Sequence, residues 1–227
     1  MTDHAKPTQA QAQAQAGADD PIVLIVDDDP SMRRALTNLF QSVGLRVEAF
    51  GSAAEVMEAK PPGVPSCLVL DIRLPGSSGF DLQADLVKAD IRTPIIFITG
   101  HGDIPMTVRA MKSGAIDFLT KPVRDQDMLD AVQAAIERDR KRRDAEKSVS
   151  SVRTRFEGLT PRQRDILALV ASGLMNKQVA AELGLAEITV KIYRGQIMRK
   201  MGAKSLADLV RMTEVLGIPR PGGKVQT

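Results

Sequence analysis

The sequence predicts an α/β domain with a doubly wound, five-stranded parallel sheet, followed by an all-α domain of four helices. Two observations carry this prediction. Short apolar runs alternate with segments of helical period over about the first 140 residues, which is typical of parallel strands joined by helices. Beyond residue 158 the helical spacing continues without strands and is punctuated by glycines that end helices. A chain of 227 residues accommodates two small domains.

The first 20 residues differ from everything that follows. They are rich in Ala and Gln (AQAQAQAGA) and contain no large apolar side chain after Met1. Because such a segment cannot bury enough surface to offset its ordering entropy, we predict a disordered leader at residues 1–20.

The α/β domain is predicted at residues 21–140. Its first, third and fourth candidate strands are nearly all apolar, as expected of strands that helices cover on both faces. The best-defined helix covers residues 31–44 and ends at Gly44. Strands joined by helices require right-handed crossovers, and these give a parallel sheet. The five candidate strands are IVLIV at 22–26, RVEAF at 46–50, CLVLD at 67–71, PIIFIT at 94–99 and AIDFL at 115–119.

A charged run, ERDRKRRDAEK at 137–147, separates the two domains. It has few apolar side chains for a core, so we interpret it as a solvated helix end that continues into a linker at residues 141–157. The helical domain follows at 158–217, and a Gly/Pro-rich stretch at 218–227 is predicted to be a flexible tail. The four predicted helices start at Thr160-Pro161, Asn176, Glu187 and Ser205, and the first three end at Gly173, Gly184 and Gly202.

The charge is distributed unevenly between the two halves. Residues 21–139 carry 12 Lys/Arg against 17 Asp/Glu, whereas residues 140–227 carry 18 against 8. The basic half indicates a polyanionic partner, although charged surfaces also occur without one.

Several protein classes are excluded by what the sequence lacks. No apolar run approaches the roughly 20 residues that a membrane-spanning helix needs, and the N-terminus has no secretory signal pattern. The single cysteine, Cys67, allows neither an internal disulfide nor a structural zinc site by itself. We therefore expect a cytoplasmic protein.

Polar side chains occur where the predicted strands end. Asp27, Asp28 and Asp29 follow the first strand, Asp71 ends the third, Thr99 ends the fourth, and Lys121 follows the fifth. Each of these residues alone has an ordinary explanation; Asp29, for example, precedes a proline and suits a helix N-cap. The carboxyl ends of parallel strands meet at one edge of a sheet, however, so the set is expected to converge.

The chemistry of this set favours phosphoryl transfer. Carboxylate oxygens are the ligands that Mg²⁺ prefers. A carboxylate beside that cation can attack phosphorus and form an acyl phosphate. A hydroxyl and an ammonium group can then hold the other phosphoryl oxygens.

Four motifs resemble the receiver domain of two-component response regulators, which has a flavodoxin-like fold. They are VDDDP at 26–30, LVLDIRLPG at 68–76, IFITGHGD at 96–103 and DFLTKP at 117–122. The resemblance implies that Asp71 is the phosphoacceptor and that Lys121, before a cis Pro122, pairs with the phosphoryl group. It also implies Mg²⁺ ligands: Asp28 directly, Asp27 through water, Asp71, and the backbone carbonyl of Arg73.

The same resemblance implies a switch between two side chains. Thr99 would turn toward a new phosphoryl group, and Phe118 would move into the space that Thr99 leaves, although Phe118 also suits simple core packing. His101 is interpreted as a loop residue, because no second histidine lies near it in the sequence.

The third helix of the second domain has two different faces. Val190, Tyr193, Ile197 and Met201 recur at helical spacing and are predicted to face the core. Lys191, Arg194, Gly195 and Met198 are predicted to project outward. Two short helices joined by a tight turn, the second of which carries this basic face, fit a helix-turn-helix. In that motif the second helix enters the major groove of DNA.

Residues 159–205 resemble the LuxR-type helix-turn-helix of the FixJ and NarL regulators, and TGHGD with the domain order matches the FixJ branch. The resemblance implies groove entry by 187–202 and dimerisation through the last helix, about 205–215. Tyr193 replaces a usual histidine, and Gly195 occupies a position that often contacts DNA, so no target sequence can be carried over. The predicted DNA contacts are Lys177, Lys191, Ile192, Arg194, Gly195, Met198, Arg199 and Lys204, with Lys200 a further phosphate contact.

The resemblance implies a response regulator that is not an enzyme. Its expected partners are a sensor histidine kinase, duplex DNA with an inverted repeat, RNA polymerase and a second copy of the chain. Two other protein classes are alternatives. A phosphatase with Asp71 as nucleophile often has a second acid two residues later, where this chain has Arg73. A regulator that binds only proteins through its helical domain fits the basic charge of that domain less well.

Overall fold

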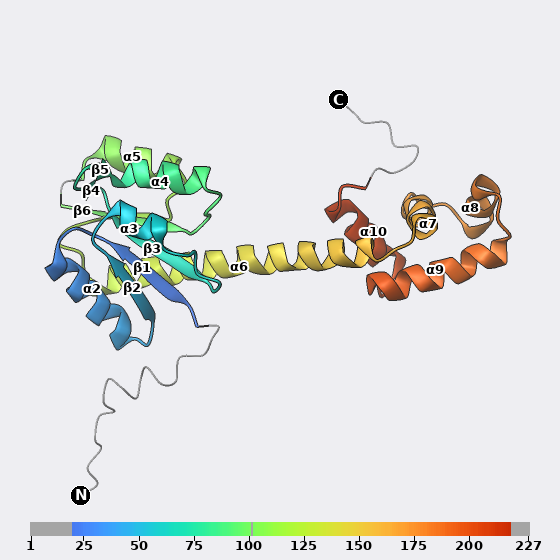
Figure 1. Cartoon of the computed structure of the whole chain (residues 1–227), viewed down its shortest axis with the longest axis horizontal. Coiled ribbons are helices and arrows are strands. Elements are labelled where there is room, and N and C mark those ends of the chain that lie inside the picture. The colour runs from blue at the N-terminus through green and yellow to red at the C-terminus, as the bar shows by residue number, and fades with distance from the viewer. Residues whose placement is uncertain (1–19, 101, 219–227) are drawn as a thin grey trace, which may run out of the picture. The chain divides into compact units, whose positions relative to one another are not determined.

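A computed structural model describes residues 20–100 and 102–218 (Figure 1). The chain forms two compact units, with the boundary between Arg143 and Asp144. The predictions for the leader up to residue 19, for His101 and for the tail from residue 219 lie outside the described residues. Within the described ranges, no helix is both long and apolar enough to span a bilayer.

A five-stranded parallel sheet forms the centre of the first unit. Its strand order is β2-β1-β3-β6-β7, as expected for a doubly wound sheet, so the predicted fold class is confirmed. The strands lie within two residues of the predicted ranges; the last one begins at Asp117 rather than at residue 115. Their bounds are β1 (Ile22–Val26), β2 (Arg46–Phe50), β3 (Ser66–Asp71), β6 (Ile95–Thr99) and β7 (Asp117–Thr120).

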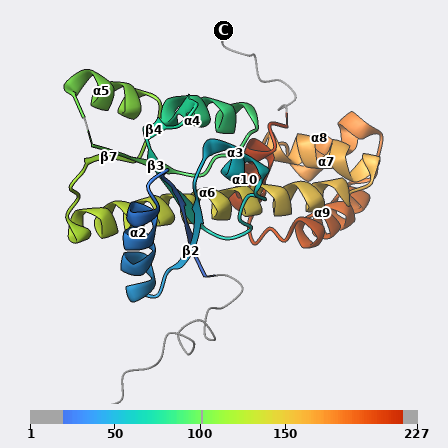
Figure 2. The ribbon, with the colours of Figure 1, turned by 60° about the vertical axis from the view of Figure 1, so that its left-hand side comes forward.

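Helices cover both faces of this sheet (Figure 2). On one face, α2 (Pro30–Ser42) and the first half of α6 (Asp125–Glu157) pack against alternate residues of β1, β3 and β6. On the other face lie α3 (Ala53–Glu58), α4 (Gly79–Lys88) and α5 (Ile104–Lys112). A small antiparallel ribbon of β4 (Arg73–Leu74) and β5 (Ser77–Ser78) follows β3. Because both faces are covered, β1, β3 and β6 are buried along their whole length.

The predicted start of α2 is confirmed in atomic detail. The Asp29 carboxylate accepts a hydrogen bond from the backbone N–H of Ser31 at 2.8 Å, and Pro30 occupies the first turn. The helix ends before Gly44, whose φ of 81° suits a residue without a side chain. The Asp29 side chain is therefore used in capping, which separates it from its two acidic neighbours.

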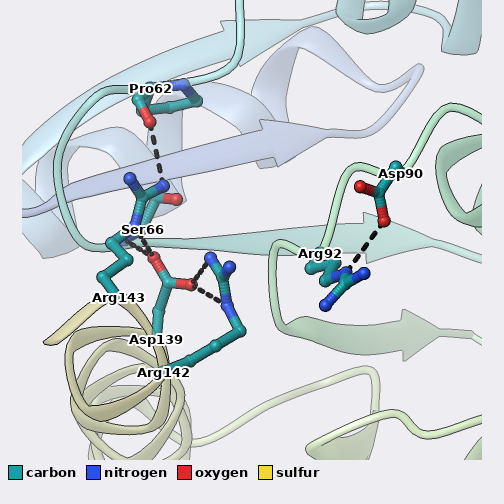
Figure 3. A network of polar contacts seen from close by, with 7 residues as sticks. All are labelled: Pro62, Ser66, Asp90, Arg92, Asp139, Arg142 and Arg143. Atoms are coloured by element: carbon teal, nitrogen blue, oxygen red, sulfur yellow. Dashed lines mark hydrogen bonds and ion pairs between the residues drawn. The ribbon is translucent and has the colours of Figure 1, made fainter. Parts of the chain in front are cut away.

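A buried ionic network ties α6 to the start of β3 (Figure 3). The Asp139 carboxylate is fully buried and accepts hydrogen bonds from the backbone N–H of Ser66 at 3.0 Å, from Arg142 and from Arg143. Arg143 also donates to the carbonyl oxygen of Pro62 at 2.9 Å. These contacts continue the helix past the end of its apolar face, and the segment predicted as a linker at 141–157 is helical throughout.

The described part of the second unit, up to residue 218, contains four further helices, as predicted. They are α7 (Pro161–Ala171), α8 (Asn176–Leu183), α9 (Glu187–Met201) and α10 (Leu206–Val215). Thr160 and Gln163 form a capping box at the start of α7. The caps of α8 and α9 are Gly184 and Gly202, both in the left-handed region. One apolar cluster fills the space between these helices, with Ile166, Leu167, Val179 and Val190 among its fully buried members.

Candidate functional site

The acidic site lies where the strand order reverses, between β1 and β3. These strands are adjacent and parallel, and Val26 is in register with Leu70, so the next residues, Asp27 and Asp71, lie side by side. Both side chains are buried: Asp27 is fully buried and Asp71 is 6% exposed. The sheet therefore brings Asp27 and Asp71 together from distant parts of the sequence, as predicted.

Lys121 binds both of these carboxylates. Its Nζ atom lies 2.7 Å from Oδ2 of Asp27 and 2.6 Å from Oδ2 of Asp71. Burial alone would lower the pKa of Lys121, but its hydrogen bonds to the two aspartates outweigh this effect and raise the pKa above its ordinary value. Burial also raises the pKa of Asp27, although the bond to Lys121 opposes the shift. The ammonium group is thus held in its charged form between two acids.

Backbone groups fix the second oxygen of each carboxylate. The Oδ1 atom of Asp27 accepts from the N–H of Asp29 at 2.9 Å, and Oδ1 of Asp71 accepts from the N–H of Arg73 at 2.9 Å. Both carboxylates are therefore oriented by short local hydrogen bonds as well as by Lys121. Such orientation favours a carboxylate that must attack along a defined direction.

The donor atoms fit a hard divalent cation. Carboxylate oxygens of Asp27, Asp28 and Asp71 lie within 4.8 Å of one another, and Asp28 is exposed to solvent. Three oxygen donors, one of them accessible, match the preference of Mg²⁺ for a few carboxylates with several retained waters. The site can therefore place a cation next to two buried carboxylates.

The two residues of the predicted switch lie close to this site. Thr99 is fully buried at the end of β6, and its carbonyl oxygen accepts from the N–H of Lys121 at 2.7 Å. Phe118 lies in β7 and is half-buried against the apolar cluster of α3, α4 and α5. The peptide bond between Lys121 and Pro122 is cis, as predicted.

Three residues that the sequence did not single out support the site. Arg33 donates to the carbonyl oxygen of Asp27 at 2.6 Å. A Cβ atom on Gly79 would lie 2.5 Å from the carbonyl oxygen of Asp71, and one on Gly102 would lie 2.9 Å from the Phe118 ring. Neither glycine has a positive φ, so only the three-dimensional packing reveals why a side chain is excluded there.

The second candidate site is the outward face of α9. Val190, Ile197 and Met201 are buried and Tyr193 is half-buried against the core, as predicted. On the opposite side, Lys191, Ile192, Gly195 and Arg199 are exposed. Lys177 on α8 and Lys204 after α9 are exposed as well. These six residues provide an accessible face with four cations.

Three of the predicted DNA-facing residues are placed differently. Met198 is half-buried and packs against the core, so the prediction that it projects outward was wrong. Arg194 is half-buried and donates to the side-chain oxygen of Asn176 at 2.9 Å, which links α9 to α8. Lys200 donates to the Gly158 carbonyl and to the Gln163 side chain, which turns it toward α7.

Comparisons with known protein families match both units. Residues 23–133 match the family described as response regulator receiver domain. Residues 157–213 match the family described as bacterial regulatory proteins, luxR family.

Individual relatives share this two-part organisation. The chain is 68% identical over 197 residues to nodulation protein W of Bradyrhizobium diazoefficiens, and the match covers 87% of each protein. It is 41% identical over 196 residues to the transcriptional regulatory protein FixJ of Azorhizobium caulinodans, covering 86% of this chain and 93% of that one. Among solved structures, it resembles the response regulator StyR with a TM-score of 0.79 and 48% identity, covering 86% of this chain and 98% of that chain.

Proposed function

The chain belongs to the two-component response regulators of the FixJ/NarL family, which join a receiver domain to a LuxR-type DNA-binding domain, and we propose that Asp71 is its phosphoacceptor. As a member of this family it is a transcriptional regulator and not an enzyme. Its receiver implies a sensor kinase as partner, and its second domain implies DNA. In the proposal the receiver covers residues 21–140 and the DNA-binding domain 158–217, and the protein acts in the cytoplasm.

One observation carries the assignment of Asp71. It is the acid at the end of β3 that shares Lys121 with Asp27, and its carboxylate is oriented by the N–H of Arg73. In the proposed step an Asp71 oxygen forms a bond to phosphorus while the bond from phosphorus to the kinase histidine breaks. Lys121 then moves its hydrogen bonds from the free carboxylate to the phosphoryl oxygens, and the Thr99 hydroxyl donates to another of them.

The acids of the site would hold Mg²⁺ in this proposal. Asp28 and Asp71 would bind it directly and Asp27 through water, and the carbonyl oxygen of Arg73 would complete the set of protein ligands. The ion would neutralise the charge of the phosphoryl group. Support comes from the three carboxylates whose oxygens lie within 4.8 Å.

The proposed output is a change in shape around β7. Once Thr99 turns toward the phosphoryl group, Phe118 moves inward and alters the surface formed by α5, β7 and α6. The activated chain forms a homodimer, binds an inverted repeat through α9 and acts on RNA polymerase. The proposed contacts with DNA are the exposed residues Lys177, Lys191, Ile192, Gly195, Arg199 and Lys204, with Arg194 at the edge of that face.

Phosphoryl uptake tests the assignment directly. The full chain is incubated with acetyl phosphate and Mg²⁺, and the acyl phosphate is measured by its retardation in a phosphate-binding gel. We expect uptake by the wild type and none by Asp71→Asn. The control is Asp29→Asn, because Asn also caps helices and the Asp29 side chain accepts from the N–H of Ser31 at the start of α2. Full uptake by Asp71→Asn would show that another residue is the acceptor.

Selection from random duplexes tests the coupling between the two domains. Duplexes are selected with the full chain and Mg²⁺, in the presence and absence of beryllium fluoride, which mimics the phosphoryl group. We expect enrichment of an inverted repeat only with the mimic. Equal enrichment without it would retain DNA binding and exclude phosphorylation as the activating step.

A further inference from the structure

The outward face of α9 has an uncharged centre, although the unit around it is basic. Ile188, Ile192 and Gly195 follow one another at helical spacings of four and three residues, so they form one line on the side opposite the buried Val190 and Ile197. We call these three residues the aliphatic stripe. The side chains of Ile188 and Ile192 are 63% and 56% exposed.

Folding gives no reason for the isoleucines of the stripe. Neither Ile188 nor Ile192 belongs to the apolar cluster that fills the second unit. Exposed β-branched side chains also lower helix propensity relative to Ala. A face that is kept aliphatic at the cost of local stability therefore indicates a partner with apolar groups of its own.

Gly195 supports the same conclusion independently. A Cβ atom added there would meet nothing within 4 Å, and Gly195 is not among the glycines with positive φ. The fold would thus accept Ala, which is favoured in a helix interior by about 1 kcal/mol. The missing side chain leaves open space directly beside Ile192 on the outward face.

The major groove of DNA offers one apolar group, the C5 methyl group of thymine. An isoleucine cannot donate to or accept from a guanine or adenine edge, but it can pack on that methyl group. Two exposed cations border the stripe: Lys191 lies to one side of it, and Arg199 continues its line one turn beyond Gly195, and both suit the phosphates at the walls of the groove. An aliphatic line with cations at its side and at its end is therefore complementary to thymines in a groove that phosphates border.

We propose that Ile188 and Ile192 select thymine by contact with its C5 methyl group, and that Gly195 lets the backbone of α9 approach the base pairs closely. This inference rests on the proposed DNA binding by α9. It predicts that the centre of each half-site is specified by methyl contacts rather than by hydrogen bonds from arginine or asparagine side chains.

Deoxyuridine provides the test, because it pairs like thymidine and lacks only the C5 methyl group. In the inverted repeat selected above, the thymines of each half-site are replaced singly, and binding of the beryllium fluoride-treated wild type is measured. We expect one or two replacements to weaken binding roughly fourfold each, the effect of about 0.8 kcal/mol for one buried methyl group. Wild-type binding that is unaffected by every replacement would overturn the inference while the proposed function stands.

Matched variants assign the contact to the stripe. Ile192→Ala and Ile188→Ala should each bind thymine and deoxyuridine equally well at one position, whereas the control Val149→Ala, an exposed aliphatic residue on α6, should discriminate like the wild type. Full discrimination by both isoleucine variants would also overturn the inference. Gly195→Ala should melt at a higher temperature yet bind the selected DNA site more weakly. Unchanged DNA binding would overturn the part of the inference that concerns Gly195. If no duplex is selected under any condition, the proposed DNA binding is wrong, and the inference that rests on it falls with it.

Discussion

The two units of this protein present their functional residues in opposite ways. In the first unit, Asp27, Asp71 and Lys121 come from three segments far apart in the sequence; the two aspartates are buried, and both are bonded to the half-buried Lys121. In the second unit, Lys191, Ile192 and Gly195 lie on a single helix and are exposed. A reaction centre and a recognition surface have different physical requirements, and the two units satisfy them separately.

The difference concerns what holds the charges in place. A buried carboxylate is costly to desolvate unless a counter-charge and hydrogen bonds compensate, so each buried carboxylate of the first unit depends on its neighbours. A cation on the exposed face of α9 is hydrated and needs no partner. Substitutions in the buried networks should therefore destabilise the first unit strongly, whereas substitutions on the exposed face of α9 should change the stability of the second unit little and weaken DNA binding directly.

The chain contains one reporter for each unit. Its single cysteine, Cys67, is fully buried in β3 of the first unit, and its single tyrosine, Tyr193, lies in α9 of the second. Thiol labelling in urea therefore follows unfolding of the first unit, and tyrosine fluorescence follows unfolding of the second, both in the full chain.

Asp139→Ala should give the largest loss of stability. It leaves Arg142, Arg143 and the N–H of Ser66 without the carboxylate that they share, and breaking a buried ionic network costs about 3 kcal/mol. Labelling of Cys67 should begin at a lower urea concentration, and the tyrosine transition should not move. The control is Glu137→Ala, because the ion pairs of Glu137 are exposed. Equal midpoints for the two variants would show that the buried network contributes nothing.

Lys121→Ala should come next, with a loss of about 2 kcal/mol in the first unit. The substitution leaves Asp27 and Asp71 side by side without a cation, and two buried like charges repel. Millimolar Mg²⁺ should restore part of the loss if it binds between these acids. Lys88→Ala is the comparison, since its pair with Asp85 lies on the surface and its removal should leave the midpoint unchanged.

Two glycines of the second unit should respond in opposite directions. Gly202→Ala should destabilise this unit by about 1 kcal/mol, because φ is 69° and an added Cβ would press on the Arg155 guanidinium. Gly195→Ala should stabilise it by up to about 1 kcal/mol, because the position is helical and open. The tyrosine transition in urea measures both changes; shifts of the same sign would contradict the comparison.

The smallest expected signal is the labelling of Cys67 without denaturant. Burial raises the pKa of its thiol to about 12, and the carboxylate of Asp139 adds to the shift. At pH 8 the native thiol should therefore react with a disulfide reagent far more slowly than a free thiol. Fast labelling of the folded chain would show that the first unit opens readily at β3.

Local rules of the sequence predicted most of the fold. Apolar runs placed all five strands of the sheet within two residues, and Asp29-Pro30, Thr160-Pro161, Gly184 and Gly202 marked helix ends correctly. That residues 141–157 are helical was not predicted, because part of the support for that helix comes from distant residues. Asp139 accepts from the N–H of Ser66, and Arg143, which binds Asp139, donates to the carbonyl oxygen of Pro62. Those contacts join residues more than 70 positions apart, which no local pattern reports.

The fold class, the edge of the sheet at which the acids meet, and the core face of α9 could all be predicted from the amino-acid order alone. These features follow from periodicity, from caps and from the rule that parallel strands end together. Other features became visible only in three dimensions: an added side chain at Gly79 or Gly102 would clash, Lys200 turns toward α7, Met198 packs inward, and Gly195 faces open space. The physical reason is that steric room and hydrogen-bond partners belong to neighbours in space, whereas periodicity and capping are properties of neighbours along the chain.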